Sequence, residues 1–287
     1  MMGLRLDRRG LTLVELLIGL IVASLVGSTM IKVMLSEARA SSQREAWRTA
    51  RSVARGSLNR LLTDLRMVEA EGGVIAAASD GQTLTIRVPY AMGILCSSTA
   101  PVTAALLPVD APTWAAASFG GFAWRDTLTG SYTYVTSGVS LAVGSAAVCT
   151  TNSVTPVDPS GGATSRIVLL SGALGGAPAI GTPVVLFEQV EYRFAPSTLV
   201  PGQIGLWRRT NSRDEELAAP FDPTSRIRYY VAGSATPQDN TPASLADLRG
   251  FELRLRGESD PPAAGGPPKQ VKDRKSTRLN SSHPYRS

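Results

Sequence analysis

The sequence predicts an α+β protein in which one long N-terminal helix packs on an antiparallel β-rich head. An apolar run followed by an amphipathic stretch without proline predicts the helix. Beyond it the hydrophobic spacing changes to a period of two, which is typical of strands. The 287 residues include 27 Gly and 19 Pro, which indicates many turns in the head. Because hydrophobic residues make up 43% and charged residues 18%, a largely disordered chain is excluded.

Residues 11–31 are apolar apart from a few Ser and Thr residues and one acid, Glu15. At about 1.5 Å per residue, a helix over this segment has the length of the roughly 30 Å hydrocarbon core of a bilayer. The sequence therefore predicts a transmembrane helix over 11–31. An ionised carboxylate in hydrocarbon costs several kcal/mol unless it is paired, so Glu15 is a candidate functional residue.

The helix is expected to continue over 32–71 as an amphipathic segment that ends at Gly72-Gly73. Apolar side chains recur there every three or four residues, which predicts one buried face: Trp47, Ala50, Ala54, Leu58, Leu61, Leu65 and Val68. Arginines occupy other positions: Arg44, Arg48, Arg51, Arg55, Arg60 and Arg66. They indicate a solvated face, with contact to an anionic partner as the alternative.

The segment before the apolar run carries a recognisable motif. Residues 8–17 read Arg-Arg-Gly-Leu-Thr-Leu-Val-Glu-Leu-Leu. This resembles the processing site of type IV prepilins and type II secretion pseudopilins, in which a short basic leader, here 1–10, ends in glycine. The resemblance implies that a prepilin peptidase cuts between Gly10 and Leu11 and methylates the new N-terminus at Leu11. Most members of the family have Phe where this chain has Leu, and both are apolar.

The resemblance also implies a role for Glu15 in subunit assembly. Cleavage frees an α-amino group on Leu11, whose reference pKa of about 7.7–8 keeps it largely protonated near neutral pH. In lipid both charges are costly alone, so Glu15 of one subunit is expected to pair with the Leu11 amine of its neighbour and set the axial register. The alternative is an interfacial Glu15 that reaches toward lipid headgroups.

Gly19, Ala23 and Gly27 lie four residues apart on one face of the apolar helix. Small residues at this spacing allow helices to approach closely in lipid, so we expect a packing stripe in a filament core. The alternative is that Gly and Ala are simply common in membrane helices. A cleaved secretory signal is a competing interpretation of the whole segment, although its apolar region is usually shorter, about 7–15 residues.

A β-rich head is expected over 74–257. Seven segments have the composition and alternation of strands: Thr83–Val88, Tyr132–Thr136, Arg166–Ser171, Val184–Phe194, Ile204–Arg209, Arg226–Val231 and Phe251–Arg256. Stretches rich in Ala, Ser, Thr, Pro and Gly at 97–121, 150–165 and 232–243 predict loops. Glu215-Glu216 predicts a solvated turn.

The C-terminal region is expected to lie outside the fold. Residues 258–272 read as a Pro/Gly-rich linker, and 273–287 resemble a translated sequencing adapter, with a natural basic tail as the alternative. The two ends account for five of the six net positive charges and leave 11–272 at +1. We therefore expect no nucleic-acid partner. The only histidine, His283, lies in the excluded stretch.

Cys96 and Cys149 both lie in the part of the chain that would be exported, where a disulfide is stable. It would close a loop of about 54 residues and contribute roughly 4 kcal/mol by the chain-entropy model. Two buried free thiols are the alternative. Their spacing excludes a CxxC redox or zinc motif.

No catalytic motif stands out: the sequence has no Walker loop, G-x-G-x-x-G or G-x-S-x-G, and no Asp-x-Asp run. We expect neither catalysis nor a cofactor or metal, with a calcium site assembled in three dimensions as the alternative. Residues 61–66 also resemble the end of this helix in J-class minor pseudopilins and W-class minor pilins.

The resemblance implies a minor pilin or pseudopilin, a structural subunit of a type IV pilus or a type II secretion pseudopilus. The expected partners are prepilin peptidase, other pilins or pseudopilins, the inner-membrane assembly platform and the membrane. The chain would cross the bacterial inner membrane once, with its head in the periplasm, and join a filament on assembly. The alternative is a singly membrane-anchored periplasmic binding protein or enzyme.

Overall fold

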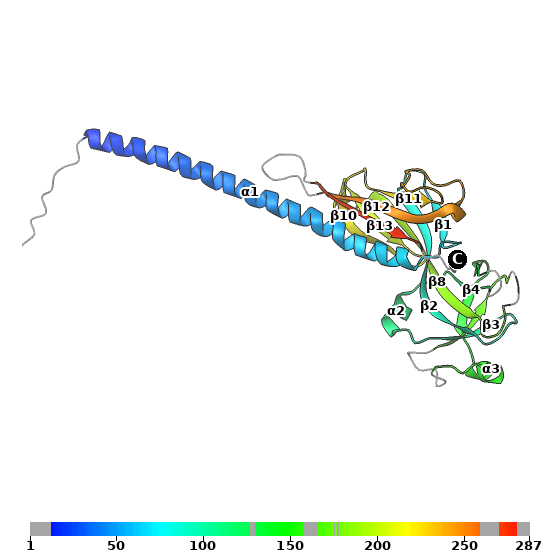
Figure 1. Cartoon of the computed structure of the whole chain (residues 1–287). Coiled ribbons are helices and arrows are strands. Elements are labelled where there is room, and N and C mark those ends of the chain that lie inside the picture. The colour runs from blue at the N-terminus through cyan, green and yellow to red at the C-terminus, as the bar shows by residue number, and fades with distance from the viewer. Residues whose placement is uncertain are drawn as a thin grey trace, which may run out of the picture.

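The computed structural model describes residues 13–126, 130–157, 166–174, 176, 178–258 and 270–279. One long helix, α1 (Leu13–Met67), precedes an antiparallel β-rich head that carries two short helices, α2 (Ala111–Ala116) and α3 (Ala146–Thr151), and a 3-10 turn, Leu245–Asp247. The fold is therefore α+β, as the sequence predicts (Figure 1).

The strands follow in chain order: β1 (Val74–Ala77), β2 (Thr83–Leu95), β3 (Val102–Leu106), β4 (Gly121–Arg125), β5 (Tyr132–Val135), β6 (Ser140–Val143), β7 (Ile167–Ser171), β8 (Pro183–Pro196), β9 (Ile204–Arg209), β10 (Asp214–Phe221), β11 (Arg226–Val231), β12 (Leu248–Glu258) and β13 (Gln270–Arg278).

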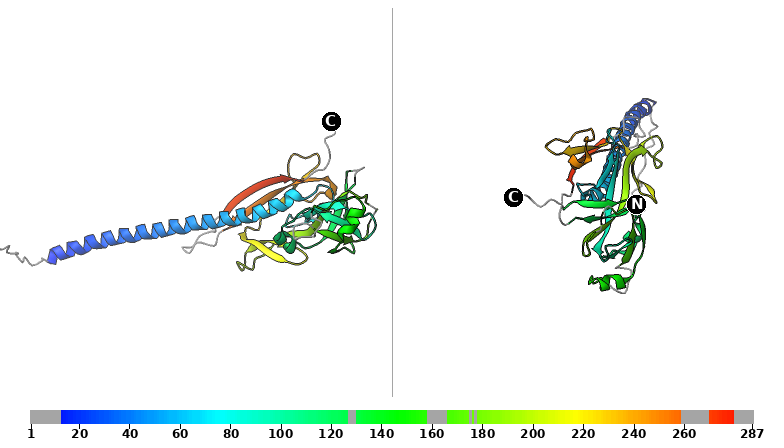
Figure 2. Two further views of the ribbon diagram at one scale, coloured as in Figure 1. Left: turned by 90° about the horizontal axis from the view of Figure 1, so that it is seen from below. Right: turned by 90° about the vertical axis from the view of Figure 1, so that its right-hand side faces the viewer.

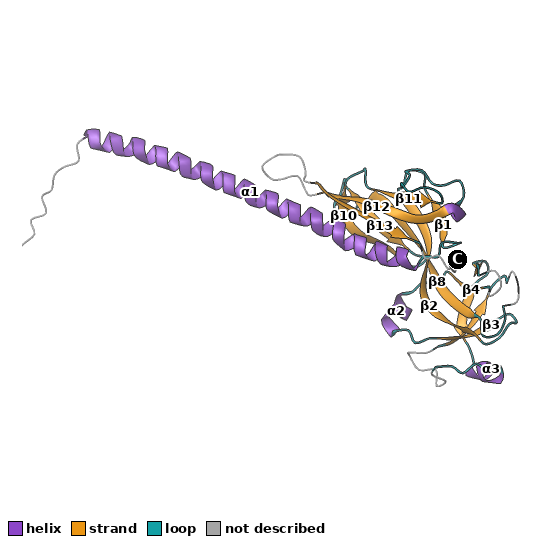
Figure 3. Ribbon diagram, in the orientation of Figure 1, coloured by secondary structure: helices purple, strands orange, loops and turns teal. Residues whose placement is uncertain are grey.

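The molecule has the shape of a rod joined to a head. The C-terminal part of α1 lies against β10, β12, β13 and β2, while its N-terminal part extends away from the head without touching it (Figures 1 and 2). Figure 3 shows that the head consists almost entirely of strands and loops. A single helix thus connects the free apolar segment to the sheet.

Two long strands organise the sheet, whose main path runs β11-β12-β10-β9-β8-β2-β3-β7-β6. β2 and β8 pair antiparallel along their whole length, with an irregularity between Pro89 and Ala91. Two hydrophobic clusters of the head meet at this irregularity. We call the one around α1, β9 and β12 the helix-side half, and the one around β3, β4 and β7 the distal half.

The amphipathic part of α1 packs as its spacing predicts where its side chains are described. Leu58, Leu61, Leu65 and Val68 are buried in the helix-side half. The side chains of Trp47, Ala50 and Ala54 lie outside the described set.

The helix ends at Met67, four residues before the expected end at 71. The chain turns there because Gly72 has a φ of +78°, in the region that glycine favours. The Arg87 guanidinium donates a hydrogen bond to the Gly72 carbonyl, and the backbone N–H of Arg87 donates to the Gly73 carbonyl at 2.7 Å. These bonds attach the turn to β2.

All seven predicted strands are present, and those at Ile204–Arg209 and Arg226–Val231 have the predicted bounds. The expected loop at 97–121 was wrong in part, because it contains β3 and α2. All five β3 residues are buried, and the strand lies inside the sheet, paired with β2 on one edge and β7 on the other. The expected turn at Glu215-Glu216 is also wrong: both residues lie in β10, where the Glu216 carboxylate accepts a hydrogen bond from the Thr198 backbone N–H at 2.9 Å.

The C-terminal end differs from its expectation. Gln270–Arg278 forms β13, which pairs with β12 from Glu258 to Gly250, and Leu279 beyond it is buried in the helix-side half. The end of the expected linker and the first part of 273–287 therefore belong to the sheet. Almost any sequence can pair as a strand through its backbone, so β13 does not need a hydrophobic pattern. Leu279 adds one buried apolar contact with the helix-side half. Residues 259–269 and 280–287 lie outside the described residues.

Truncation of Leu65, which is fully buried, to Ala is expected to lower the free energy of unfolding by about 2–5 kcal/mol, because it leaves a cavity between α1 and the sheet. Met67→Ala is the matched control, since Met67 is 41% exposed and its loss should cost well under about 1 kcal/mol. Guanidinium titration of the detergent-solubilised chain, followed by tryptophan fluorescence, measures both. Equal losses for the two variants would contradict the packing described.

Candidate functional site

The predicted processing site lies at the edge of what the structure describes. Gly10 and Leu11 are outside the described residues, and α1 begins at Leu13. Glu15 lies in the first turn of α1 and is exposed. The structure thus places Glu15 at the end of the rod farthest from the head, next to the segment that holds the predicted cut (Figure 1).

The apolar part of α1 packs against nothing in the described protein. One segment, Leu13–Ser42, is long and apolar enough to cross a membrane, with a mean hydropathy of 2.1. Its large side chains are exposed: Leu13 at 80%, and even the most covered, Ile21, at 49%. Exposed apolar surface of this extent is costly in water, so the segment needs lipid or other protein around it.

The predicted small-residue stripe is open to neighbours. A Cβ added at Gly19 or Gly27 would meet nothing within 4 Å, and Ala23 between them is exposed. A second helix could therefore approach the backbone closely along this face. The structure brings Gly19, Ala23 and Gly27 onto one side of the helix and leaves that side free in the single chain.

The helix is fixed to the head by a buried charged cluster that the sequence analysis missed. Asp64 of α1 is 2% exposed, and its Oδ2 accepts hydrogen bonds from the Tyr192 hydroxyl at 2.6 Å and from the Arg208 Nε at 3.0 Å. The Arg208 Nη2 donates in turn to Glu188 Oε1 at 2.6 Å. Arg60, one turn earlier on α1, lies 3.7 Å from the other Asp64 oxygen.

Three elements assemble this cluster. Glu188 and Tyr192 are four residues apart on β8, so they point to the same face, and Arg208 on β9 lies directly opposite Tyr192. Burial raises the pKa of Tyr192, and the nearby Asp64 charge raises it further, so the phenol stays a donor. Burial would lower the pKa of Arg208, but the nearby Asp64 charge, the Tyr192 phenol and the hydrogen bond and charge of Glu188 together outweigh this effect and raise the pKa. The charges of the cluster therefore compensate one another.

One sequence signal pointed to Asp64 without revealing its partners. Asp64 lies within residues 61–66, the short stretch that resembles minor pseudopilins and minor pilins, and it interrupts an otherwise apolar helix face. An acid on such a face usually has a buried partner. Arg208 and Glu188 alternate with apolar residues in their strands, so nothing in the sequence separates them from surface charges.

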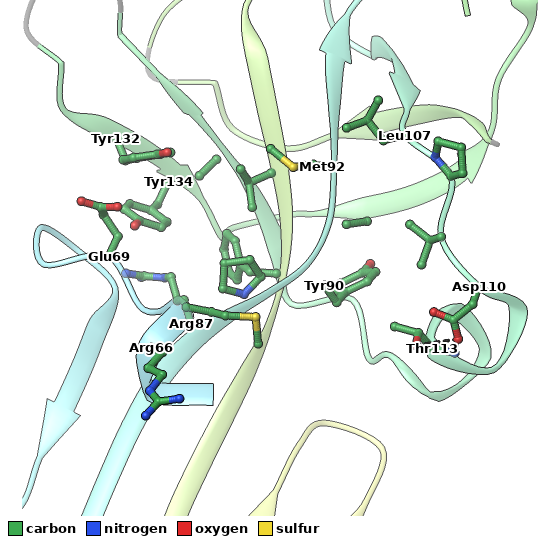
Figure 4. Close-up of a pocket in the computed structure, with 18 residues that line it drawn as sticks. Arg66, Glu69, Arg87, Tyr90, Met92, Leu107, Asp110, Thr113, Tyr132 and Tyr134 are labelled. Carbon is green, nitrogen blue, oxygen red and sulfur yellow. Dashed lines mark hydrogen bonds between the residues drawn. The ribbon is translucent and has the colours of Figure 1, made fainter. Parts of the chain in front are cut away.

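A cavity of about 670 Å³ opens beside this cluster, between the end of α1, β2, α2 and β5 (Figure 4). Apolar side chains line much of it, including Pro89, Met92 and Leu107. Arg66, Glu69, Arg87, Tyr132 and Tyr134 line one side in Figure 4, whereas Tyr90, Asp110 and Thr113 line the other.

The polar groups of this cavity are suited to binding. The Arg87 guanidinium lies 4.5 Å from the centre of the Tyr134 ring, a cation–π distance. Burial raises the pKa of both Tyr90 and Tyr134, so the two phenols stay neutral at physiological pH. Apolar walls with a few hydroxyl donors are typical of a site that binds an apolar or aromatic group.

A disulfide joins Cys96 and Cys149, with an S–S distance of 2.06 Å. It attaches α3 to the end of β2, and the Asn152 amide strengthens the contact by donating to the Cys96 carbonyl at 2.8 Å. The two cysteines and Ile167 form a small cluster in which both sulfurs are fully buried. The disulfide therefore closes the far end of the distal half.

The described residues contain no group of three or more His, Cys, Asp or Glu side chains placed to hold a metal ion. Three acidic side chains of the head bond to other protein groups. Asp110 caps α2 by accepting from the Thr113 N–H, and Asp239 accepts from Arg228 at 2.8 Å. Asp222 accepts from the Thr224 N–H at 2.7 Å.

Comparison with known proteins gives no match: no protein-family model, no curated protein and no solved structure resembles this chain closely enough to be paired with it. Any assignment of function therefore rests on the residues and the geometry described above.

Asp64→Asn is expected to lower the free energy of unfolding by about 3–5 kcal/mol, because it leaves the buried Arg208 with only one carboxylate. Asp214→Asn is the control: Asp214 also bonds arginines, but on the surface, where such pairs contribute about 1 kcal/mol or less. Guanidinium unfolding of both variants in detergent gives the comparison. A loss for Asp64→Asn no larger than that for Asp214→Asn would contradict the anchoring role.

Proposed function

We propose that this chain is a minor pilin or minor pseudopilin, a structural subunit of a type IV pilus or type II secretion pseudopilus. One observation carries the proposal: the prepilin-type motif around Gly10 and Leu11 directly precedes a helix whose apolar segment extends free of the head. A leader that is cut at that glycine would leave the apolar rod at the N-terminus of the mature chain.

The proposed assembly step depends on two charges that need each other. After cleavage, the α-amino group of Leu11 and the carboxylate of Glu15 both lie at the start of an apolar helix. Neither is stable alone in lipid, and together they offset most of each other's desolvation cost. Pairing between neighbouring subunits would therefore select one axial stagger. The open face at Gly19, Ala23 and Gly27 would let the helices come close enough for it.

The head is proposed to follow the rod as one body. The buried Asp64–Arg208 pair and the apolar face of α1 join the helix to the sheet, so a displacement of the rod is transmitted to the head. In the proposed cycle the protein is held in the inner membrane with its head in the periplasm, and is then extracted into the filament. Its partners would be prepilin peptidase, the assembly platform and other pilins or pseudopilins.

A minor rather than a major role fits the size of the head. The described head runs from Val74 to Leu279 and carries two short helices and many loops in addition to the sheet. Major subunits of the resembling family are usually shorter. The resemblance of residues 61–66 to J-class pseudopilins and W-class pilins supports the same choice, and it does not distinguish a secretion system from a pilus.

One observation favours a second candidate, a singly anchored binding protein. The cavity of about 670 Å³ is within the range of small-molecule sites and has apolar walls with phenol donors. A protein of this kind would keep the helix as a permanent anchor. The two candidates differ in what happens at Gly10 and in the need for Glu15.

The mature protein is expected to begin at N-methylated Leu11 when the chain is expressed in cells that contain a prepilin peptidase. Mass spectrometry of the N-terminal peptide from the membrane fraction measures this. Gly10→Val is the matched variant and should leave the leader attached. An intact Met1 in the unaltered chain, or a start near Ser28, would exclude processing at Gly10.

Replacing Glu15 by Gln is expected to lower incorporation into filaments at least tenfold while the protein stays in the membrane, because the Leu11 amine of the neighbouring subunit loses its partner. Glu37→Gln serves as the control, since Glu37 is exposed farther along the same helix. Immunoblots of sheared filaments and of membranes give both quantities. Normal incorporation of Glu15→Gln would favour the anchored binding protein.

A further inference from the structure

The distal half of the head ends in a strand whose outer edge pairs with no other described strand. β6 is the last strand on the sheet path and pairs only with β7 among the described strands. It lies in a stretch, 127–157, that contains no charged residue. Exposed edge strands in soluble proteins usually carry charges, proline or a covering loop, because a bare edge pairs with other strands.

The backbone groups that face outward on β6 follow from its pairing with β7. The Gly144 N–H donates to the Ile167 carbonyl at 2.8 Å, and the register puts Ala142 opposite Leu169. Because hydrogen-bonded and non-hydrogen-bonded pairs alternate in an antiparallel ladder, Ala142 bonds to β7 as Gly144 does. Leu141 and Val143 therefore direct their N–H and C=O groups away from β7.

The side chains on this edge are uncharged and incompletely buried. Leu141 packs partly against the distal cluster, whereas Val143 on the same face is 89% exposed. Ser140 and Ala142 lie on the opposite face, and both are exposed. Among the described residues, the edge thus combines backbone donors and acceptors that bond to no other strand with one large apolar side chain that has little to pack on.

We propose that β6 is a strand-pairing surface for a second copy of this chain, in which the two β6 strands run antiparallel with Ala142 opposite Ala142. In this register the outward groups of Leu141 in one copy bond to those of Val143 in the other, and the reverse pair forms by symmetry. The two sheets then continue into each other through four backbone hydrogen bonds.

The self-complementarity of the edge favours a second copy over a foreign strand. In the proposed register the exposed Val143 of each copy lies beside Leu141 of the other, so each copy supplies the apolar neighbour that the other lacks. The strand itself carries no charge that would oppose the approach, because 127–157 has none. Copies held in one membrane by the apolar part of α1 would also meet at a high effective concentration.

The proposed register makes a test at one position possible. In Ala142→Cys the two new thiols would lie in a directly opposed, non-hydrogen-bonded pair, with Cα atoms about 4.5 Å apart. Mild oxidation of the full-length chain in membranes is expected to give a disulfide-linked dimer, with the linked peptide identified by mass spectrometry. Ser140→Cys is the matched control: it lies on the same face, but opposite Gly144 of the second copy, and should link at least tenfold more slowly.

A second variant tests the backbone pairing itself. Adding Val143→Pro to Ala142→Cys removes an outward N–H that β7 does not use, and should reduce cross-linking at least tenfold while the unfolding midpoint changes little. If the proline variant is unstable, Val143→Lys adds a charge to the edge and should have the same effect. Equal cross-linking of Ala142→Cys and Ser140→Cys, or capture of a different protein instead of a second copy, would overturn the proposal.

Discussion

The Asp64 carboxylate, buried where α1 meets the sheet, accepts hydrogen bonds from Arg208 and Tyr192, and the position of the whole rod depends on this contact. Apolar packing of Leu58, Leu61 and Leu65 holds the helix on the sheet but has no direction, so alone it would tolerate a slip along the axis. A slip of one turn, about 5.4 Å, would separate the carboxylate from its partners and leave a buried charge uncompensated. The charged cluster therefore fixes the register that the apolar residues leave free.

One continuous helix has to satisfy two environments. From Ser57 to Met67 it alternates buried and exposed residues against the head, whereas Leu13–Ser42 is largely apolar and touches no part of the described head. A helix that is apolar all round is stable only in lipid or within a bundle. The same element thus presents an apolar surface that needs lipid or other protein around it at one end, and packs on a folded head at the other. This division is what the proposed function uses.

The sequence predicted the features that local periodicity determines. The long helix and the bounds of β9 and β11 follow from residue spacing, whereas the sequence left open whether Cys96 and Cys149 form a disulfide, which the structure shows. Strands β3 and β6 were not predicted, because each is short and lies within a stretch rich in Ala, Ser, Thr and Gly, which has the composition of a loop.

The anchoring cluster and the cavity could not be predicted from the sequence either, for a different reason. Asp64 and Arg208 are 144 residues apart, and only the sheet topology brings them together. β13 was missed because its composition is that of an exposed tail, and a strand at the end of a sheet needs backbone groups more than a hydrophobic pattern.

The cavity and the cluster lie side by side because β8 changes partners there. One edge of β8 pairs with β2 throughout, whereas the other pairs with β9 from Glu191 onward and with β4 up to Phe187. Glu188 lies between the part of β8 that pairs with β4 and the part that pairs with β9. Its carboxylate accepts hydrogen bonds from Arg208 and, at 3.4 Å, from the Ser118 N–H. On the opposite edge of β8, the pairing with β2 is irregular between Pro89 and Ala91, and Pro89 has no backbone N–H to donate.

The head therefore has two halves with different roles. The helix-side half fixes the rod with charges, and the distal half is held by the shared strands β2 and β8 and by the disulfide at their far end. Because the hydrophobic cluster of the distal half contains no residue of α1, the uncharged edge at its end can vary without loosening the anchor. In the proposed function, in which the subunit is pulled by its helix, this separation would keep the anchor intact while the head varies.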